Sequence, residues 1–523
     1  MIDPMLDSNY RPIEPGSPVI DTGSDFPTGG LPSRDQSGNS RRIGGRVDRG
    51  AYESSVSNVQ TLTVTSSANS GAGTLRQAIL DANANAIEKR IVFSLAQACS
   101  STINLTTALP SLTTSTAIAG ETQAGSQETL HPRLFDGTPC VVLNGAGNLA
   151  NGLNFATASA GQRMSVSGLA FYGFTSEAVR ISGPGRDIVR GNTFGTGAPI
   201  LAQGFTDAAI RIDNAPGTLI GGRSPDARNV ISRAVLSGIH LLDGVGGRDI
   251  IGNNIGIALN GNLALANGTG ILIAGGAGDR IERNYIGFNT GRGIRIVAGA
   301  QASSDVVITH NGLGIAPGNA SSGEDPADAG NVSNAVRVEN GSGHRILDND
   351  IRFNDGDALA VLAAARRVEI ARNQISRNTG QAIDLSPDGI NLNDNDVGAT
   401  GANDSLNFPN LSAALGNPDS GFAQGLLQSR NGCFRIEVFA SPVCDANGFG
   451  EADLLIGSGL VTITNATASN GSIAFSIPIA DEDDPLIGRQ ITAIAIESNG
   501  NSSEVSACRT YVLGPNIFAN GFE

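Results

Sequence analysis

Acidic side chains crowd one short stretch of the chain, where Asp348, Asp350, Asp355 and Asp357 lie near His344. Glycoside hydrolysis needs two carboxyl groups, one as a general acid and one as a base or nucleophile. Aspartate is equally an ordinary residue of exposed turns. We therefore expect a structural or solvated role for this stretch and retain Asp350, Asp355 and Asp357 as the candidate catalytic residues. No Ser-His-Asp elbow, phosphate loop or dinucleotide fingerprint accompanies them.

A second stretch is rich in side-chain oxygens on a glycine-containing loop. Its members are Asp388, Asn391, Asn393, Asp394, Asn395 and Asp396. Calcium takes ligands of this kind, but the complete calcium-loop pattern with its internal glycine and terminal glutamate is missing. We expect a turn without metal, and calcium held by Asp388, Asp394 and Asp396 is the alternative. No other cofactor is expected.

Arginine recurs at one position of a repeated pattern, in which a small residue precedes an apolar, a variable and an apolar residue. The nine copies begin at Gly152, Ala178, Ala209, Gly238, Gly270, Gly293, Ala335, Ala358 and Ala382. Alternating apolar residues predict a β-strand whose variable residue faces solvent. Four variable residues are arginines, namely Arg180, Arg211, Arg295 and Arg337, and a fifth is His240.

These arginines could form a basic stripe for a ligand with repeated carboxylates or sulfates. Asp213 follows Arg211 by two residues, and Glu339 follows Arg337 in the same way. Each acid would lie on the same face as its arginine and could neutralise it, as surface ion pairs commonly do. The sequence leaves both interpretations open, and the stripe is the candidate ligand-binding site.

A second repeated element places asparagine at one equivalent position, three residues after an apolar one. Its members are Asn192, Asn253, Asn284, Asn311, Asn349 and Asn373. We interpret this column as an amide ladder along a turn, where asparagine tolerates the left-handed backbone conformation. A metal or sugar site is the alternative.

Strands of period two, separated by glycine and asparagine turns in a unit of about 23 residues, cannot each bury an apolar face alone. Parallel stacking solves this, with inward Ile, Val and Leu in columns and rungs about 4.8 Å apart. The consensus of leucine-rich repeats and the Trp-Asp signature of β-propellers are missing. The sequence therefore predicts an all-β fold, a right-handed parallel β-helix.

The composition argues against several classes of protein. Lys and Arg total 34 against 49 Asp and Glu, so the net charge is −15 and nucleic acid is not an expected partner. No stretch reaches the ~18 apolar residues of a transmembrane segment. The N-terminus lacks the regions of a signal peptide, which alone predicts a cytoplasmic protein, although the resemblances described next imply export.

Residues 70–86 predict an amphipathic helix that begins with a capping box of Thr74 and Gln77. Its expected apolar face comprises Leu75, Ile79, Ala82 and Ala86. The segment Gly73-Thr-Leu-Arg-Gln-Ala78 resembles the Cys-Ser-Leu-Arg-Glu-Ala motif of bacterial secreted β-helix proteins, with the cysteine replaced. The resemblance implies a helix that caps the open end of a β-helix.

Further segments resemble parts of surface β-helix proteins. Residues 17–53 resemble the closing segment of the choice-of-anchor Q family, which implies that residues 1–53 are the remnant of an upstream domain. Residues 380–414 resemble the stretch that closes such a β-helix, and residues 433–513 resemble the β-sandwich that follows. The tail 517–523 is similar to endings of exported bacterial proteins. The expected domains are the remnant 1–53, a cap with first coils 54–150, β-helix coils 151–408, a small antiparallel β-sandwich 409–513 and a tail 514–523.

The five cysteines show no Cys-x-x-Cys spacing, so zinc and thioredoxin-type sites are not expected. The resemblances imply an oxidising compartment, where disulfides form. Because each pair lies within one expected domain, we predict disulfides Cys99–Cys140 and Cys444–Cys508. Cys433 would remain free.

These features together predict a monomeric, non-enzymatic extracellular or cell-surface protein. It would be an adhesin-like scaffold that presents a rigid face to an anionic polysaccharide or a cell-surface partner. The alternative is a carbohydrate-active enzyme, a polysaccharide lyase or glycoside hydrolase acting on the β-helix face. With no Trp and five Tyr, the chain is poorly equipped to stack sugars on aromatic rings, so we expect polar recognition.

Overall fold

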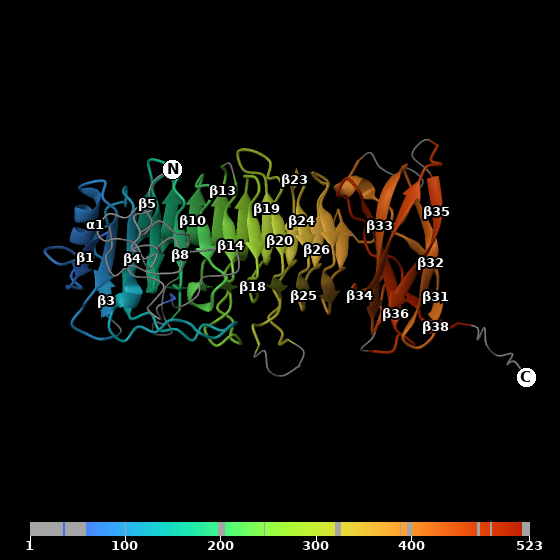
Figure 1. Cartoon of the computed structure of the whole chain (residues 1–523), viewed down its shortest axis with the longest axis horizontal. Helices are drawn as coiled ribbons and strands as arrows, with labels where there is room; N and C mark the ends of the chain where they lie inside the picture. The colour runs from blue at the N-terminus through green and yellow to red at the C-terminus, as the bar shows by residue number, and fades with distance from the viewer. Residues whose placement is uncertain are drawn as a thin grey trace, which may run out of the picture. The chain divides into compact units, whose positions relative to one another are not determined.

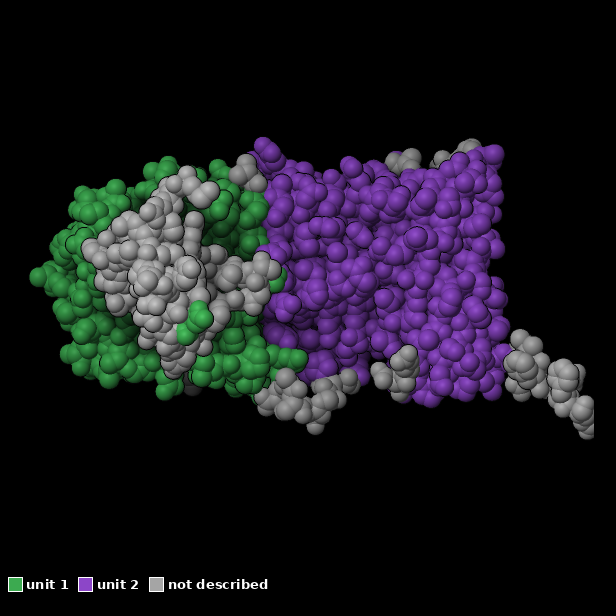
Figure 2. Space-filling model, in the orientation of Figure 1, with its two compact units in different colours: residues 1–267, 317–324 green, residues 268–316, 325–523 purple. Residues whose placement is uncertain are grey.

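The computed structural model describes most of the chain, in two compact units that Figure 2 distinguishes by colour. The described residues are 35–36, 59–99, 101–196, 204–244, 246–318, 326–386, 389–394, 400–467, 471–481 and 484–514. Unit 1 comprises Met1–Asn267 and Pro317–Glu324, and unit 2 comprises Gly268–Ala316 and Asp325–Glu523. Nearly all regular structure in both units is β-strand.

Unit 1 winds into coils in which equivalent strands of successive coils pair in parallel columns (Figure 1). The repeated pattern forms the motif column, with β5 (Val141–Ala156), β7 (Leu169–Ser182), β10 (Ala208–Asp213) and β13 (Ser237–Leu242). A second column contains β1 (Gln60–Val64), β2 (Lys89–Phe93), β4 (Thr116–Ala119), β6 (Met164–Ser167), β8 (Ile188–Arg190), β11 (Leu219–Gly221) and β14 (Asp249–Ile251). Shorter strands complete the coils, namely β3 (Ser101–Asn104), β9 (Thr193–Phe194), β12 (Val230–Ile231) and β15 (Asn254–Ile255).

Unit 2 begins with coils of the same construction. Its motif column contains β16 (Thr269–Ala274), β19 (Ile294–Val297), β22 (Val336–Val338), β26 (Leu359–Val361) and β30 (Ile383–Leu385). The second column contains β17 (Arg280–Glu282), β20 (Val307–Thr309), β24 (Arg345–Leu347) and β28 (Glu369–Ala371). The third contains β18 (Tyr285–Ile286), β21 (Gly312–Leu313), β25 (Asp350–Arg352) and β29 (Gln374–Ser376), and β23 (Gly341–Ser342) pairs with β27 (Ala365–Arg366).

The variable residues of the motif column lie in register from coil to coil. In unit 1 the register runs Asn154, Arg180, Arg211, His240, and in unit 2 it runs Leu272, Arg295, Arg337, Ala360, Asp384. Their apolar neighbours point inward, and Ile210, Ile212, Ile294 and Ile296 are all 0% exposed. The predicted right-handed parallel β-helix is thereby confirmed, because each copy of the motif pairs with the equivalent residues of the copy on the next coil.

The asparagine column forms amide ladders, as predicted. In unit 1, Asn192 donates through Nδ2 to Oδ1 of Asn229 at 3.2 Å, and Asn229 donates to Asn253 at 2.9 Å. In unit 2 the equivalent ladder runs Asn284, Asn311, Asn349, Asn373, and a second ladder runs Asn289, Asn331, Asn354, Asn378. These buried amides satisfy one another, so the alternative of a metal or sugar site does not apply to them.

The left-handed residue of each such turn is not the asparagine, which corrects the expectation. Asp348 takes φ 56°, whereas the ladder residue is the following Asn349. Asn349 Nδ2 donates to the carbonyl oxygen of Leu347 at 3.0 Å and so closes the turn around Asp348. The Asn349 side chain thereby holds Asp348 in the left-handed backbone conformation. Arg283, His310 and Arg372 have the same conformation, each directly before a ladder asparagine.

A short helix, α1 (Leu75–Asn83), packs on β1 at the start of unit 1. The Thr74 hydroxyl accepts a hydrogen bond from Gln77 N at 3.3 Å, so the capping residue is confirmed. The buried face includes the expected Leu75, Ile79 and Ala82, together with Ala78. Ala86 is exposed because the helix ends at Asn83, and its inclusion in that face was wrong.

The C-terminal part of unit 2 is an antiparallel β-sandwich, as predicted. One sheet contains β31 (Asn410–Gly416), β32 (Ser420–Ser429), β35 (Gly471–Ala480) and β38 (Val512–Leu513), and the other contains β33 (Gly432–Ser441), β34 (Leu454–Ile463), β36 (Gln490–Glu497) and β37 (Arg509–Thr510). Both sheets contribute to one core that includes Leu427, Phe434 and Ile491. The predicted disulfides Cys99–Cys140 and Cys444–Cys508 are confirmed, and Cys433 is free and exposed.

Candidate functional site

The arginines of the unit 1 motif column are engaged by acidic side chains. Arg180 Nη2 lies 2.7 Å from Asp213 Oδ2, and Arg211 Nε donates to Asp213 Oδ1 at 2.7 Å. Arg211 Nη1 also donates to Asp207 at 3.0 Å and lies 3.9 Å from Glu177. Two arginines thus face three carboxyl groups. The predicted pairing of Arg211 with Asp213 is confirmed.

Burial governs the protonation of the remaining groups in this cluster. Burial and, less strongly, the charge of Asp207 raise the pKa of Glu177. Burial and the charge of Arg211 lower the pKa of His240, so its imidazole adds no positive charge at neutral pH. The unit 1 part of the stripe is therefore close to neutral, and its arginines already have internal anions.

The motif column of unit 2 has a different balance of charge. Arg295 donates through Nε and Nη2 to the two carboxylate oxygens of Glu339 at 2.8 and 3.1 Å. Arg337 Nε donates to the same carboxylate at 3.0 Å, which confirms the predicted pair. Burial alone would raise the pKa of Glu339, but hydrogen bonds and charge from both arginines outweigh burial and lower that pKa. One carboxylate therefore serves two arginines.

Arg292 adds a third guanidinium beside this pair. Its Nε atom is buried, and the guanidinium makes no hydrogen bond or ion pair with any residue that the structure describes. Burial and the charges of Arg337 and Arg295 lower its pKa, as expected for crowded cations. Arg292, Arg295, Arg337 and Glu339 form what we call the arginine patch. Three cations and one anion give the patch a net charge of about +2, in a chain whose net charge is −15.

Arg292 was missed at the level of sequence. It lies one residue before the small residue Gly293 of its motif copy, so a search confined to the variable position does not find it. The available signal was a second arginine in the segment Gly291-Arg-Gly-Ile-Arg-Ile296. No other copy of the motif has two arginines in the equivalent segment.

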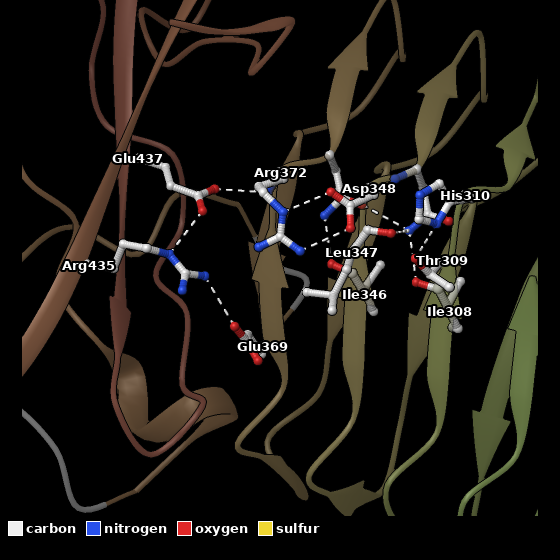
Figure 3. A network of polar contacts seen from close by, with 12 residues as sticks. Ile308, Thr309, His310, Ile346, Leu347, Asp348, Glu369, Arg372, Arg435 and Glu437 are labelled. Atoms are coloured by element: carbon white, nitrogen blue, oxygen red, sulfur yellow. Dashed lines mark hydrogen bonds and ion pairs between the residues drawn. The ribbon is translucent and has the colours of Figure 1, made fainter. Parts of the chain in front are cut away.

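Most aspartates of the candidate catalytic stretch make hydrogen bonds or ion pairs with neighbouring residues of the β-helix. Asp348 receives two hydrogen bonds from Arg372, from Nε at 2.8 Å and from Nη2 at 2.9 Å, and Figure 3 shows this pair on adjacent coils. Asp350 accepts from Arg352 Nε at 2.6 Å. His344 is 0% exposed, and burial lowers its pKa.

The other two candidates lie on the turn that follows. Asp357 accepts from Asn334 Nδ2 at 2.9 Å and from the backbone of Gln381 at 3.0 Å, so it links three coils. Asp355 is exposed on the same turn. These contacts give Asp350 and Asp357 fixed partners, and a general acid with a matched base is not evident among them.

One of the three candidate calcium ligands, Asp394, lies among the described residues. Asp388 and Asp396 lie outside the described residues. The main chain of Asp394 exchanges hydrogen bonds with the Asn407 side chain at 3.2 and 2.9 Å. Within the described ranges, no group of three or more His, Cys, Asp or Glu side chains could hold a metal ion. The expected turn without metal stays a prediction, and calcium stays its alternative.

Other expectations also fall outside the described residues. Apart from Asp35 and Gln36, residues 1–53 are not described, and neither is the tail 517–523. The resemblance to choice-of-anchor proteins therefore stays a prediction. Among the helices that the structure describes, none is long and apolar enough to cross a membrane.

Comparison with known proteins yields no family. No family model matches the chain, and no curated protein matches it. A solved structure of ORF18 from Geobacillus virus E2 shares 10% identity, with 86% of this chain and 76% of that chain covered and a TM-score of 0.43. The mannuronan C-5 epimerase A-module of Azotobacter vinelandii shares 14% identity, with 61% and 78% covered and a TM-score of 0.30. A periplasmic alginate epimerase shares 11% identity with a TM-score of 0.28, and the match covers 58% of this chain and 60% of that epimerase. At these identities and TM-scores, the matches carry no argument about what this chain binds or does.

Proposed function

We propose that the protein is an extracellular or cell-surface β-helix scaffold that binds an anionic polysaccharide through the arginine patch of unit 2. The observation that supports this is the unpaired guanidinium of Arg292 beside Arg295 and Arg337, which share one carboxylate. Crowding like charges is unfavourable in an isolated protein, and a bound anion would relieve it. Two disulfides support an oxidising location.

The geometry suits a repeating ligand. Arg295 and Arg337 occupy paired positions on β19 and β22, so their backbones lie one rung, about 4.8 Å, apart. A polysaccharide lying across the strands would place successive sugars over successive rungs. Arginine binds carboxylate and sulfate by paired hydrogen bonds, as Arg295 already binds Glu339. The side chains of Arg295 and Arg337 are 37% and 23% exposed, so a ligand can reach them.

The test measures retention of the full chain on polygalacturonate and dextran sulfate at increasing salt, with neutral dextran as the blank. The variant Arg292→Ser/Arg295→Ser/Arg337→Ser should bind roughly tenfold more weakly at low salt, a change of about 1.4 kcal/mol. Binding by the unchanged protein should also weaken with salt, because screening acts on exposed charges.

Two single variants sharpen the comparison. Arg180→Ser is the matched control, since Arg180 occupies the variable position of the motif in unit 1 but shares Asp213 with Arg211, and its loss should leave retention unchanged. Glu339→Gln frees two arginines and should strengthen retention a few-fold, a gain that misfolding cannot imitate. Equal retention of the triple variant and the unchanged protein would refute the proposal.

The same polysaccharides test the alternative, a carbohydrate-active enzyme. Release of reducing ends or unsaturated sugars during incubation would favour a hydrolase or lyase over a scaffold. The scaffold proposal expects retention without release.

A further inference from the structure

The motif column of unit 1 contains three side chains in a row that can each carry a positive charge. Arg180 pairs in register with Arg211, and Arg211 pairs in register with His240, so the three lie on successive rungs. Successive rungs are about 4.8 Å apart. At neutral pH the row is interrupted, because burial and the charge of Arg211 lower the pKa of His240 and leave its imidazole uncharged. The row of cations is complete only when His240 is protonated.

The His240 ring is buried, and its Nδ1 atom has no hydrogen-bond partner within the described part of the chain. The residue is 8% exposed. Asp207 Oδ1 lies 4.0 Å from His240 Nδ1, which is beyond hydrogen-bonding distance. A movement of roughly 1 Å would close this gap to a charge-assisted hydrogen bond once the ring is protonated. Asp207 is therefore placed to accept from the His240 imidazolium.

The same aspartate serves Arg211 when His240 is neutral. Asp207 Oδ2 accepts from Arg211 Nη1 at 3.0 Å. Glu177 Oε1 lies 3.9 Å from the same Nη1 atom, and burial raises the pKa of Glu177. As the pH falls, Glu177 therefore takes up a proton above the usual 4.5, and His240 takes one up below the usual 6.5. The cluster gains about two units of positive charge, and Arg211 loses its two weaker partners.

Two further charged groups act on His240, and neither reverses this change. Asp213 raises the pKa of His240, and Arg248 lowers it. Arg248 is 1% exposed and donates to the carbonyl oxygens of Leu242 and Asp243 at 3.4 and 2.9 Å, so its charge is fixed in place. Asp213 is already bonded to the two arginines of the row. Asp207 is thus the carboxylate that can change partners.

We propose that Arg180 and Arg211 form a second anion-binding site in unit 1, which opens in acid and takes the sulfate esters of a polysaccharide. The opening step is the transfer of Asp207 from Arg211 to protonated His240. The side chains of Arg180 and Arg211 are 42% and 22% exposed, so a ligand can reach them. Sulfate esters stay ionised in acid, whereas carboxylates begin to take up protons. His240 lies below the surface and acts through Asp207, so it is a positioning residue.

The experiment uses the full chain without the arginine patch, Arg292→Ser/Arg295→Ser/Arg337→Ser, so that retention reports on unit 1 whatever the patch binds. Retention on dextran sulfate at constant ionic strength should rise about tenfold from pH 7.5 to pH 4.5. Adding His240→Gln should reduce this gain to about twofold, the part that general loss of carboxylate charge supplies. The matched control is His310→Gln, which removes an exposed imidazole from unit 2 and should keep the full gain.

Two further variants locate the site within the cluster. Arg180→Ser should have no effect at pH 7.5 and should lose most of the gain at pH 4.5. Asp207→Asn removes the carboxylate that neutralises Arg211 and should raise retention at pH 7.5, which a misfolded chain would not do. Polygalacturonate is the second ligand, and an acid gain on it equal to that on dextran sulfate would refute the selection of sulfate.

A measurement on the unchanged chain needs no variant. A ligand that binds the protonated form tenfold more tightly raises the pKa of His240 by about one unit. NMR titration of the four histidines should therefore show an upward shift of about one pH unit for His240 in saturating dextran sulfate of low mass, with no comparable change at His310. An unchanged His240 titration, or an acid gain that survives His240→Gln, would overturn the proposal. A patch-free chain without any acid gain would also overturn it and would leave the arginine patch of unit 2 untouched.

Discussion

Glu451 should make the stability of unit 2 fall as the pH rises. Burial, assisted by the charges of Asp445 and Asp453, raises the pKa of Glu451 to about 8 from an ordinary 4.5, although the Arg377 N–H opposes the shift. The folded chain therefore holds a proton that the unfolded chain releases. The stabilising contribution is complete below about pH 4.5 and is lost as the pH rises through 8.

The magnitude follows from the size of the shift. A difference of about 3.5 pH units, at about 1.4 kcal/mol per unit, sets a ceiling of about 5 kcal/mol on the change in unfolding free energy between pH 4.5 and pH 9. For a unit of this size, that ceiling corresponds to a fall in Tm of roughly 10 °C. The protonated group still accepts the Arg377 N–H through its carbonyl oxygen.

The assay is thermal unfolding of the unchanged chain and of Glu451→Gln from pH 5 to pH 9. Glutamine keeps the acceptor but cannot ionise, so the variant should match the unchanged chain at pH 5 and exceed its Tm at pH 9. Asp355→Asn removes an exposed carboxyl and should leave the pH dependence as it was. Parallel pH profiles of the unchanged chain and Glu451→Gln would refute the reasoning.

Two further predictions concern the coils and the disulfides. Asn354→Ala removes an amide that is 0% exposed and donates to Leu313 O, Arg352 O and Asn378 Oδ1. Its loss should cost about 3–5 kcal/mol in denaturant unfolding, against less than about 0.5 kcal/mol for the exposed Asn260→Ala, and similar costs for both would contradict the ladder's role. Thiol titration of the folded, unreduced chain should find one reactive thiol, Cys433, and reduction should destabilise unit 1 by about 4 kcal/mol through the loop closed by Cys99–Cys140. More than one reactive thiol before reduction would contradict the pairing.

The repeat was predictable because the physics behind it is local and periodic. Alternating apolar residues fix which side chains point inward, and identical motif copies then fall on equivalent rungs. That is why the register of Arg180 with Arg211 and of Arg295 with Arg337 followed from spacing alone. Asn229 and Asn331 belong to the ladders as well, but they lie outside the recurring apolar-x-x-Asn element and so escaped the search.

The boundary between the last coil and the sandwich could not be predicted in this way. Glu504 lies 119 residues from its partner Leu385, and Asn501 lies 134 residues from Arg367. Nothing in the local pattern around these acceptors marks them, because their role depends on which strand edge the tertiary fold places opposite. Their burial, which an isolated sequence window cannot indicate, is what reveals their function.

Whether the arginine stripe binds an anion depends on residues beside the column. In each unit, two arginines lie in register on adjacent rungs of the motif column, at its variable position. In unit 1, Glu177 and Asp207 lie just before the motif copies and join Asp213 in neutralising the pair. In unit 2, the corresponding place before the motif is taken by Arg292, and among the described residues Glu339 is the acid that pairs with Arg295 and Arg337 and acts on Arg292. The column of arginines therefore defines where an anionic ligand could lie. The charged residues just before each motif copy determine whether the net charge there is positive.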